Sequence, residues 1–468
     1  MTGKRKRKLA MPDTLIIVAS VVLLVAILSW IIPSGTYDYQ EMNINGRIRN
    51  VAIDGTYHTI DKSEVTTTGF LGFFSVLYRG CVEAADVIFM ILCCCGTFGV
   101  VVKTGAFHAG TGTILKKLKG KEILLVPIIM MIFELGGSVF GMASEFYGFY
   151  PLIVGLGVAL GYDAMFGFAI IAVGEFVGFM GATLNPYSVG IAQTISGVEL
   201  YSGTGYRAIC FVIFMAISII YVMVYGRKIK KNPGASVVFG EKNIHAFDRD
   251  ELNEYSFTLK DGLVLLDVLV VLVVLMLGLI KWGWDFPQLC GLFLLMSMIA
   301  AAICKWSPNK WCSEFIDSAK TAMWGCILTG IAKAITVVMQ DAQIMDTVIY
   351  GLSNVLKNAP HAVSAQVMLV VQTLINFFIP SATGQASATM PIMAQLADII
   401  GVSRQTAVLA FQFGDGLSNI FWPTADIVII CGLGGISLQK WYKWFTPLFL
   451  ILFVTQAILL GIATGIGF

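Results

Sequence analysis

Long runs of apolar residues, separated by short polar segments, are the dominant pattern of this chain. They lie at residues 12–32, 84–102, 207–225, 263–280, 287–304 and 444–466. Each run holds about 20 residues, the length at which an α-helix crosses the roughly 30 Å hydrocarbon layer of a bilayer. The pattern therefore predicts an all-α polytopic membrane protein rather than a β-barrel.

Two further apolar stretches are broken by small residues in their middle. The first starts at residue 124, is interrupted at Gly136, Gly137 and Gly141, and continues to residue 160. We interpret it as a re-entrant hairpin, which enters the membrane and returns to the side it came from. The stretch at 367–401 has the same character, and we predict a second hairpin there that enters from the opposite side.

Each predicted hairpin is followed by an apolar helix with a break of its own. The first of these, at 164–180, resumes at 187–194 after Asn185 and Pro186. Proline removes a backbone donor and clashes with the preceding turn, so the helix is expected to be discontinuous. The second broken helix is predicted at 405–430.

The two hairpin regions match each other in sequence order. Small residues, a proline, a glycine and a glycine followed by a carboxylate recur at similar spacing. The members are Gly137–Ser144, Pro151, Gly161 and Gly174–Glu175 in the first copy, and Pro380–Ser387, Pro391, Gly401 and Gly414–Asp415 in the second. Such an internal duplication predicts two repeats of inverted topology, with the binding site where they meet.

Basic residues orient the chain, because cytoplasmic loops retain an excess of Lys and Arg. They cluster at 4–8, 116–121 and 227–231, which predicts a cytoplasmic N-terminus. Residues 30–33 offer no small-residue cleavage pattern, so we expect the first helix to be retained. The predicted location is the cytoplasmic (inner) membrane.

An inverted second repeat needs one additional crossing to start from the opposite side, and the run at 263–280 supplies it. With a further span at 319–339, the sum is about nine full spans, the two broken helices among them, and two opposed re-entrant hairpins. The chain then divides into the first helix and an external loop at 1–69, repeat 1 with the cytoplasmic-side hairpin at 70–226, a cytoplasmic linker at 227–260, an extra connecting helix at 261–286, and repeat 2 with the external-side hairpin at 287–468.

Composition excludes other classes of protein. Of 468 residues, 57% are hydrophobic and 13% charged, with a mean hydropathy of +0.80, which is more apolar surface than a soluble core hides. No CxxC, HExxH or phosphate-binding GxxxxGK[ST] motif stands in a suitable context. We therefore expect no catalytic residue, resident metal or cofactor, and no nucleic acid partner; lipid and a small-molecule substrate are the expected partners.

Small and hydroxyl-bearing residues gather at the predicted hairpin tips. Tips at mid-membrane expose free backbone groups and suit ligand or ion coordination, although small residues also let helices pack closely. Because two hairpins carry the same feature, we favour a binding site. The candidates are Ser138, Gly141, Ser144, Ser381, Thr383, Gly384, Ser387 and Thr389.

Carboxylates in the same elements are the strongest chemical signal. Glu175 and Asp415 occupy equivalent places after a glycine, and a charge at the bilayer centre costs at least about 2.5 kcal/mol. The alternative is that they are protonated or paired, yet Lys333 is the only cation predicted at mid-span. The surplus of carboxylates favours a positively charged guest: a basic substrate, Na⁺ or H⁺. Further acidic residues of these elements are Glu134, Glu145 and Asp426.

The helix breaks offer oxygen ligands. Amide, hydroxyl and freed carbonyl oxygens suit Na⁺, whereas the alternative is a simple proline kink. The candidates are Thr183, Asn185, Pro186, Ser418, Asn419 and Thr424.

The stretches 181–193, 379–387 and 413–419 resemble the YfcC-like branch of the DcuC family, within the ion transporter superfamily. The resemblance covers nearly the whole chain. It implies a two-repeat carrier, often dimeric, in which a scaffold holds a mobile domain with both hairpins and both broken helices. Relatives are labelled as carriers of C4-dicarboxylates, short-chain fatty acids or basic amino acids.

We hypothesise a secondary active transporter for a small, basic amino acid such as arginine or ornithine, working by elevator-like alternating access, by exchange or coupled to Na⁺ or H⁺, as a homodimer. Carriage of C4-dicarboxylates or short-chain carboxylates stays open as an alternative, and an ion channel is a second class. An intramembrane enzyme lacks a nucleophile and base at suitable spacing.

Overall fold

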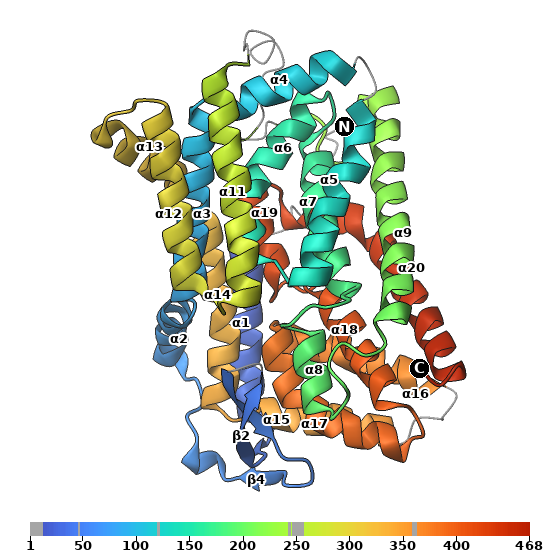
Figure 1. The fold of residues 1–468 in the computed structure, drawn as a ribbon. Helices are drawn as coiled ribbons and strands as arrows, with labels where there is room; N and C mark the ends of the chain where they lie inside the picture. The colour runs from blue at the N-terminus through green and yellow to red at the C-terminus, as the bar shows by residue number, and fades with distance from the viewer. Residues whose placement is uncertain (1–12, 45–46, 119–121, 242–244, 246–256, 358–362) are drawn as a thin grey trace, which may run out of the picture.

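The fold comes from a computed structural model that describes residues 13–44, 47–118, 122–241, 245, 257–357 and 363–468. The basic segment 4–8 and the lysines at 119 and 121 lie outside the described residues. The described chain is mostly helical and carries four short strands. It is drawn in Figure 1.

Seven helices within the described residues are long and apolar enough to cross a membrane. Each coincides with a run or span predicted from the sequence, which confirms an all-α, multi-pass membrane protein; the predicted total of about nine adds the two broken helices. The seven are α1 (Thr14–Ile31), α3 (Ala85–Lys103), α9 (Thr204–Lys231), α11 (Leu259–Lys281), α12 (Phe286–Ile303), α14 (Met323–Asp341) and α20 (Leu438–Gly465).

Local sequence sets where several of these helices begin. The Asp13 carboxylate accepts a hydrogen bond from Leu15 N at 2.9 Å and caps α1. Reciprocal capping boxes begin two further helices. Thr258 and Asp261 form the box of α11, and Asp285 and Gln288 form that of α12. Such caps satisfy the free N–H groups of a helix start, so the boundaries follow from short polar signals.

Segments read from the sequence as loops contain regular structure, which corrects those predictions. The predicted external loop forms two antiparallel pairs, β1 (Ser34–Thr36) with β4 (His58–Ile60) and β2 (Tyr39–Ile44) with β3 (Arg47–Ala52). The predicted lysine-rich loop begins inside a helix. Four helices of 13 or 14 residues, each too short for a span, were missed: α2 (Phe70–Glu83), α4 (Ala106–Leu118), α13 (Pro308–Lys320) and α15 (Met345–Lys357).

The interrupted stretches appear as helix pairs with a break between them. The pairs are α5 (Leu125–Leu135) with α6 (Phe149–Ala159), α16 (Ser364–Phe378) with α17 (Ala382–Ile399), α7 (Ala164–Met180) with α8 (Val189–Ile195), and α18 (Arg404–Ser418) with α19 (Asp426–Gly434). Between α5 and α6 the chain passes through a π-helical turn, η3 (Gly136–Phe140), and a left-handed Gly141 with φ of 67°. Glycine adopts that conformation without steric cost, which allows the reversal.

The order of elements from α1 to α9 recurs from α12 to α20. Corresponding helices have similar lengths: 18 residues for α1 and α12, 19 for α3 and α14, and 28 for α9 and α20. Packing recurs as well, because α2 lies on α14 while α13 lies on α3. In Figure 1, α5 and α6 lie toward the end of the molecule that carries α4, and α16 and α17 toward the end that carries the strands.

Two groups of helices lie side by side in Figure 1. We call α1, α2, α3, α11, α12, α13 and α14 the framework bundle, and α5–α9 with α16–α20 the hairpin bundle. The centre of the hairpin bundle is α7, in which every residue is buried, crossed by α18, which is buried from Thr406 to Ser418. At the crossing, Gly416 lies against the backbone of Met180. Both broken helices are thereby locked together at their breaks.

Candidate functional site

A cavity of about 770 Å³ lies where the two bundles meet. Its walls come from helix faces of the framework bundle and from both hairpins and the second break of the hairpin bundle. Strands β2 and β3 contribute Tyr39 and Asn50. The polar wall residues are Glu83, Thr329, Lys333, Thr336 and Gln340 on the framework side, and Ser144, Tyr147, Ser381, Ser387, Thr424 and Asp426 on the hairpin side.

Apart from Glu83, the polar residues of the framework wall form a single stripe of α14. Thr329, Lys333, Thr336 and Gln340 are spaced four, three and four residues apart, so they share one helix face. The stripe is held in place by α2, because Gly80 and Gly330 bring the two backbones into contact: a Cβ added at Gly80 would lie 2.7 Å from the backbone nitrogen of Ala334. The wall is therefore rigid relative to α2.

Two helices of the hairpin bundle begin at the cavity. Ser381 is the N-cap of α17, and its hydroxyl accepts a hydrogen bond from Gly384 N at 3.3 Å. Asp426 is the first residue of α19, and its Oδ1 accepts a hydrogen bond from the Tyr147 hydroxyl at 2.8 Å. Helix starts present N–H groups and a partial positive charge, so the α17 end suits a carboxylate.

The charged residues at the cavity wall are Glu83, Lys333 and Asp426. Arg79, near this wall on α2, is already paired with Asp341. Lys333 forms no ion pair within the part of the chain that the structure describes. The described wall therefore carries one cation and two carboxylates, and a guest with one carboxylate and two cationic groups would match all three.

Five of the residues predicted from the sequence line this cavity: Ser144, Ser381, Gly384, Ser387 and Thr424. Sequence reasoning had counted Asp426 among the acidic residues and Lys333 as a lone cation without placing either in the site. It missed Tyr147 and Glu83. The signal for Tyr147 was its place in the hairpin just after Ser144, whereas Glu83 had none, since no element was predicted between the external loop and residue 84.

The two carboxylates that we favoured as ligands are buried behind the cavity wall. Glu175 and Asp415 are fully buried and do not line the cavity. Glu175 Oε2 accepts a hydrogen bond from the Tyr150 hydroxyl at 2.8 Å, and its other oxygen has no hydrogen-bond partner in the part of the chain that the structure describes. Their role as ligands stays a prediction.

Asp415 belongs to an oxygen-rich cluster between α16 and α18. The Asn376 side-chain nitrogen faces Asp415 Oδ1 at 3.0 Å, Asn419 Oδ1 at 3.0 Å and Gln385 Oε1 at 3.2 Å. One amide carries only two N–H groups for these three acceptors. Asp415 Oδ2 and Asn376 Oδ1 also lack hydrogen-bond partners among the described residues. A surplus of inward-facing oxygens offers the type of ligand that hard cations prefer.

The break between α7 and α8 is satisfied within the protein. Asn185 donates from its side chain to Gly137 O at 3.2 Å and accepts at Oδ1 from Tyr187 N at 2.9 Å. Ser138 Oγ lies 3.1 Å from both Gly181 O and Thr183 Oγ1. A Cβ on Gly141 would collide with Asn185, so the first tip folds directly onto the first break, where Pro186 follows Asn185. These contacts favour the structural interpretation of Asn185.

The remaining predicted residues also bond within the hairpin bundle. Thr383 Oγ1 donates to Tyr187 O at 3.1 Å, which ties the second hairpin to the first break. Glu145 accepts a hydrogen bond from Ala143 N at 3.0 Å. Thr389 and Ser418 donate to the carbonyls four residues before them, at 2.8 and 2.5 Å. None of these four residues lines the cavity between the bundles.

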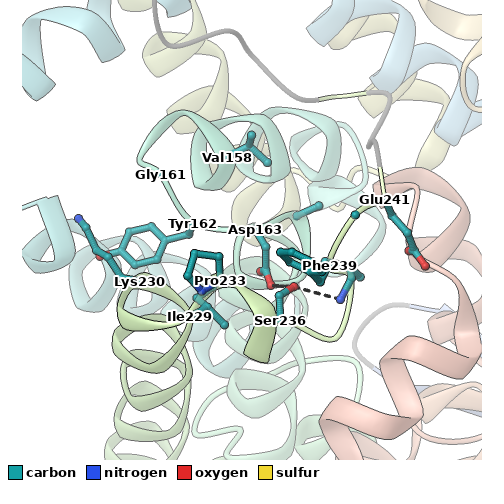
Figure 2. Close-up of a pocket in the computed structure, with 13 residues that line it drawn as sticks. Val158, Gly161, Tyr162, Asp163, Ile229, Lys230, Pro233, Ser236, Phe239 and Glu241 are labelled. Carbon is teal, nitrogen blue, oxygen red and sulfur yellow. Dashed lines mark hydrogen bonds between the residues drawn. The ribbon is translucent and has the colours of Figure 1, made fainter.

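A second hollow of about 450 Å³ lies at the end of α9, away from the hairpin tips (Figure 2). It is lined by the α6–α7 turn and by residues 233–241. Its central residue, Asp163, caps α7 through Phe166 N at 2.7 Å and accepts hydrogen bonds from the hydroxyls of Tyr225 and Ser236 at 2.5 and 2.6 Å. Asp163 therefore fastens the start of the linker to α7.

Asp163→Ala should lower the free energy of unfolding by about 2–4 kcal/mol, because a helix cap and two charge-assisted hydrogen bonds are lost together. The melting temperature of the purified protein in detergent measures this. Asp317→Ala is the control, since Asp317 is exposed and its pair with Lys320, at 2.7 Å, is a surface contact worth at most about 1 kcal/mol. Equal melting temperatures for the two variants would contradict the assignment.

Comparison with known proteins places the chain in a family. The sequence profile of DcuC, the C4-dicarboxylate anaerobic carrier family, matches residues 11–465. The chain is 32% identical over 502 residues to the Escherichia coli protein named "Putative basic amino acid antiporter YfcC", covering 100% of this chain and 99% of that one. It is 27% identical over 506 residues to an uncharacterized protein of Haemophilus influenzae, covering 99% of both.

Two solved structures show a weaker likeness. The YdaH transporter of Alcanivorax borkumensis covers 98% of this chain and 99% of its own, with a TM-score of 0.44 and 15% identity. MtrF of Neisseria gonorrhoeae, from a class of antimetabolite efflux pumps, covers 97% of this chain and 96% of its own, with a TM-score of 0.44 and 15% identity. At these values the two structures do not contribute to the assignment. On the family profile and the E. coli relative, the chain belongs to the DcuC family of membrane transporters.

Proposed function

We propose that the protein is a secondary active transporter of basic amino acids, of the arginine or ornithine type, across the cytoplasmic membrane. The charge set of the cavity carries this proposal: Glu83, Asp426 and Lys333. A basic amino acid brings one carboxylate and two cationic groups, so each wall charge gains a counter-charge. A C4-dicarboxylate would bring two negative charges to a wall that already has two, and like charges in a partly dry site repel strongly. The name of the E. coli relative supports the same substrate class.

Alternating access is the proposed mechanism. The recurring element order, the hairpins at opposite ends and a cavity between two bundles support an inverted repeat with its site at the interface. The hairpin bundle would carry the guest as a unit, elevator-like, while the framework bundle stays fixed. With a cytoplasmic N-terminus, the strand end faces outside. We also propose that the protein is a homodimer, as the resemblance to the family implies.

Coupling to Na⁺ is proposed at the oxygen cluster of Asp415, Asn376 and Asn419, with H⁺ or exchange as the alternatives. The cluster supports Na⁺ because its oxygens outnumber the available N–H groups. It also lies on α16 and α18, the helices that hold the second hairpin and the second break. Binding of a cation there would draw these two helices together before the guest is carried.

Exchange across a sealed membrane tests the proposal. Proteoliposomes loaded with unlabelled ornithine should take up labelled arginine with saturation, faster than empty vesicles, and excess unlabelled lysine should compete while succinate should not. Replacing external Na⁺ by choline tests the coupling ion separately. Saturable uptake of succinate, blocked by fumarate and not by ornithine, would contradict the substrate class. Linear flux without exchange would favour a channel.

A further inference from the structure

Lys333 occupies an unusual position in the cavity. It is partly buried, on a membrane-crossing helix, and its neighbours on the α14 stripe, Thr329, Thr336 and Gln340, are uncharged. A Lys in such a place costs free energy unless an anion compensates it. The carboxylates at the wall, Glu83 and Asp426, come from other helices and form no ion pair with Lys333 within the described residues.

The backbone around Lys333 has little freedom to move toward those carboxylates. The glycine contact of Gly80 with Gly330 and Ala334 fixes α14 on α2 one turn from Lys333. The adjacent cation, Arg79, makes two hydrogen bonds with Asp341, one of them 2.9 Å long. Arg79 is thereby occupied, which leaves Lys333 as the basic side chain of the described wall that can receive an anionic group.

We propose that Lys333 binds the α-carboxylate of the substrate and so makes the transporter select amino acids against the amines formed by their decarboxylation. The proposal rests on the proposed function and adds the residue that decides which cations are accepted. An amine has no α-carboxylate, so its binding would leave Lys333 without a counter-charge and would place the positive charges of the amine beside it. The α17 start at Ser381, with its N–H groups at the same cavity, offers the carboxylate a second contact.

The selectivity follows from the number of substrate charges that find a counter-charge in the cavity. Ornithine and putrescine carry the same two cationic groups and differ at the carboxylate, as do arginine and agmatine. Losing one partner of a desolvated charge pair typically changes affinity by about 30-fold to several thousand-fold. Wild-type protein should therefore prefer ornithine over putrescine by about 30-fold or more.

Competition against labelled ornithine in proteoliposomes tests the proposal. We expect Lys333→Gln to weaken ornithine binding by about 30-fold or more, while putrescine binds as tightly as before or more tightly. The ratio of the ornithine affinity to the putrescine affinity should therefore fall by about the same factor. Lys333→Arg should retain most of the ratio. Lys320→Gln, which removes an exposed lysine of the same bundle, is the matched control and should keep the wild-type ratio.

The ratio does not depend on how much protein folds. If Lys333→Gln transports too little to measure, ligand-induced shifts of the melting temperature give the same ratio in detergent. An unchanged ratio in Lys333→Gln, or a wild-type protein that does not distinguish ornithine from putrescine, overturns the proposal while amino acid transport stands. Absence of any saturable ornithine uptake by the wild type overturns the proposed function as well.

Discussion

Replacement of Asp426 by asparagine is expected to reduce ornithine uptake by about 30-fold or more while leaving the fold intact. The amide keeps the size of the side chain and an oxygen for the Tyr147 hydroxyl, which lies 2.8 Å from Asp426 Oδ1. It removes the negative charge that faces the guest. Truncating one member of a desolvated charge pair costs about 2–5 kcal/mol, which corresponds to this loss. Initial rates of counterflow at matched amounts of folded protein measure the effect.

Asp317→Asn is the matched control for that variant. It makes the same chemical change on an exposed helix of the framework bundle, where Asp317 pairs with Lys320, and uptake should stay close to the wild-type rate. If Asp426→Asn transports ornithine at half the wild-type rate or more, substrate binding does not depend on this carboxylate. The charges of the cavity would then no longer support a basic substrate.

Gly178→Val is expected to have the largest effect on stability, at least about 3 kcal/mol, because extra volume at a packed backbone contact has no room to relax. A Cβ at Gly178 would collide with the carbonyl of Glu134 and lie 2.8 Å from its Cα. Reciprocally, a Cβ at Gly137 would lie 2.5 Å from the carbonyl oxygen of Glu175. The first hairpin thus lies backbone to backbone on α7, where neither side can yield.

Size-exclusion profiles and melting temperatures in detergent measure that prediction. Gly291→Val serves as the comparison, since Gly291 lies in membrane helix α12 and an added Cβ would have no described atom within 4 Å; this variant should elute and melt as the wild type does. A Gly178→Val protein that melts within a few degrees of the wild type would show that the hairpin and α7 are not in close contact.

The membrane helices could be predicted because their signal is local. An apolar run of about 20 residues needs no partner to be recognised, and the range 164–180 predicted for the first broken helix is the range of α7. Glycine and proline likewise mark breaks wherever they stand, so the interruptions in the four helix pairs fall within the stretches where the sequence predicts them.

The short helices and strands were not recognised because their signal is weaker. A helix of 13 residues with polar faces, such as α13, resembles a loop when judged by apolar run length. Its amphipathic period was available in the sequence and was not used. The strands β2 and β3 are short and polar, and their pairing of Tyr39 with Ala52 depends on contacts that no local pattern reports.

The site was predicted in part, and the missing part has a geometric cause. Hydroxyl residues at hairpin tips, such as Ser144 and Ser381, were found because a tip must lie at the break. Which carboxylate reaches the cavity depends on how helices are rotated, and α7 is buried on all sides, so nothing along its sequence says which way Glu175 points. Lys333 and Asp426 come from different bundles, and only the assembled fold brings them to the same cavity.

The central claim is that a basic amino acid binds in the cavity between the two bundles, and labelling of Ser387→Cys tests it most directly. Ser387 lines the cavity, whereas the native Cys312 is exposed and serves as the internal reference. Ornithine should slow maleimide modification of the introduced cysteine in a saturable manner, succinate should not, and Cys312 should react equally throughout. Ornithine transport with unchanged labelling at position 387, or protection by succinate instead, would contradict the account.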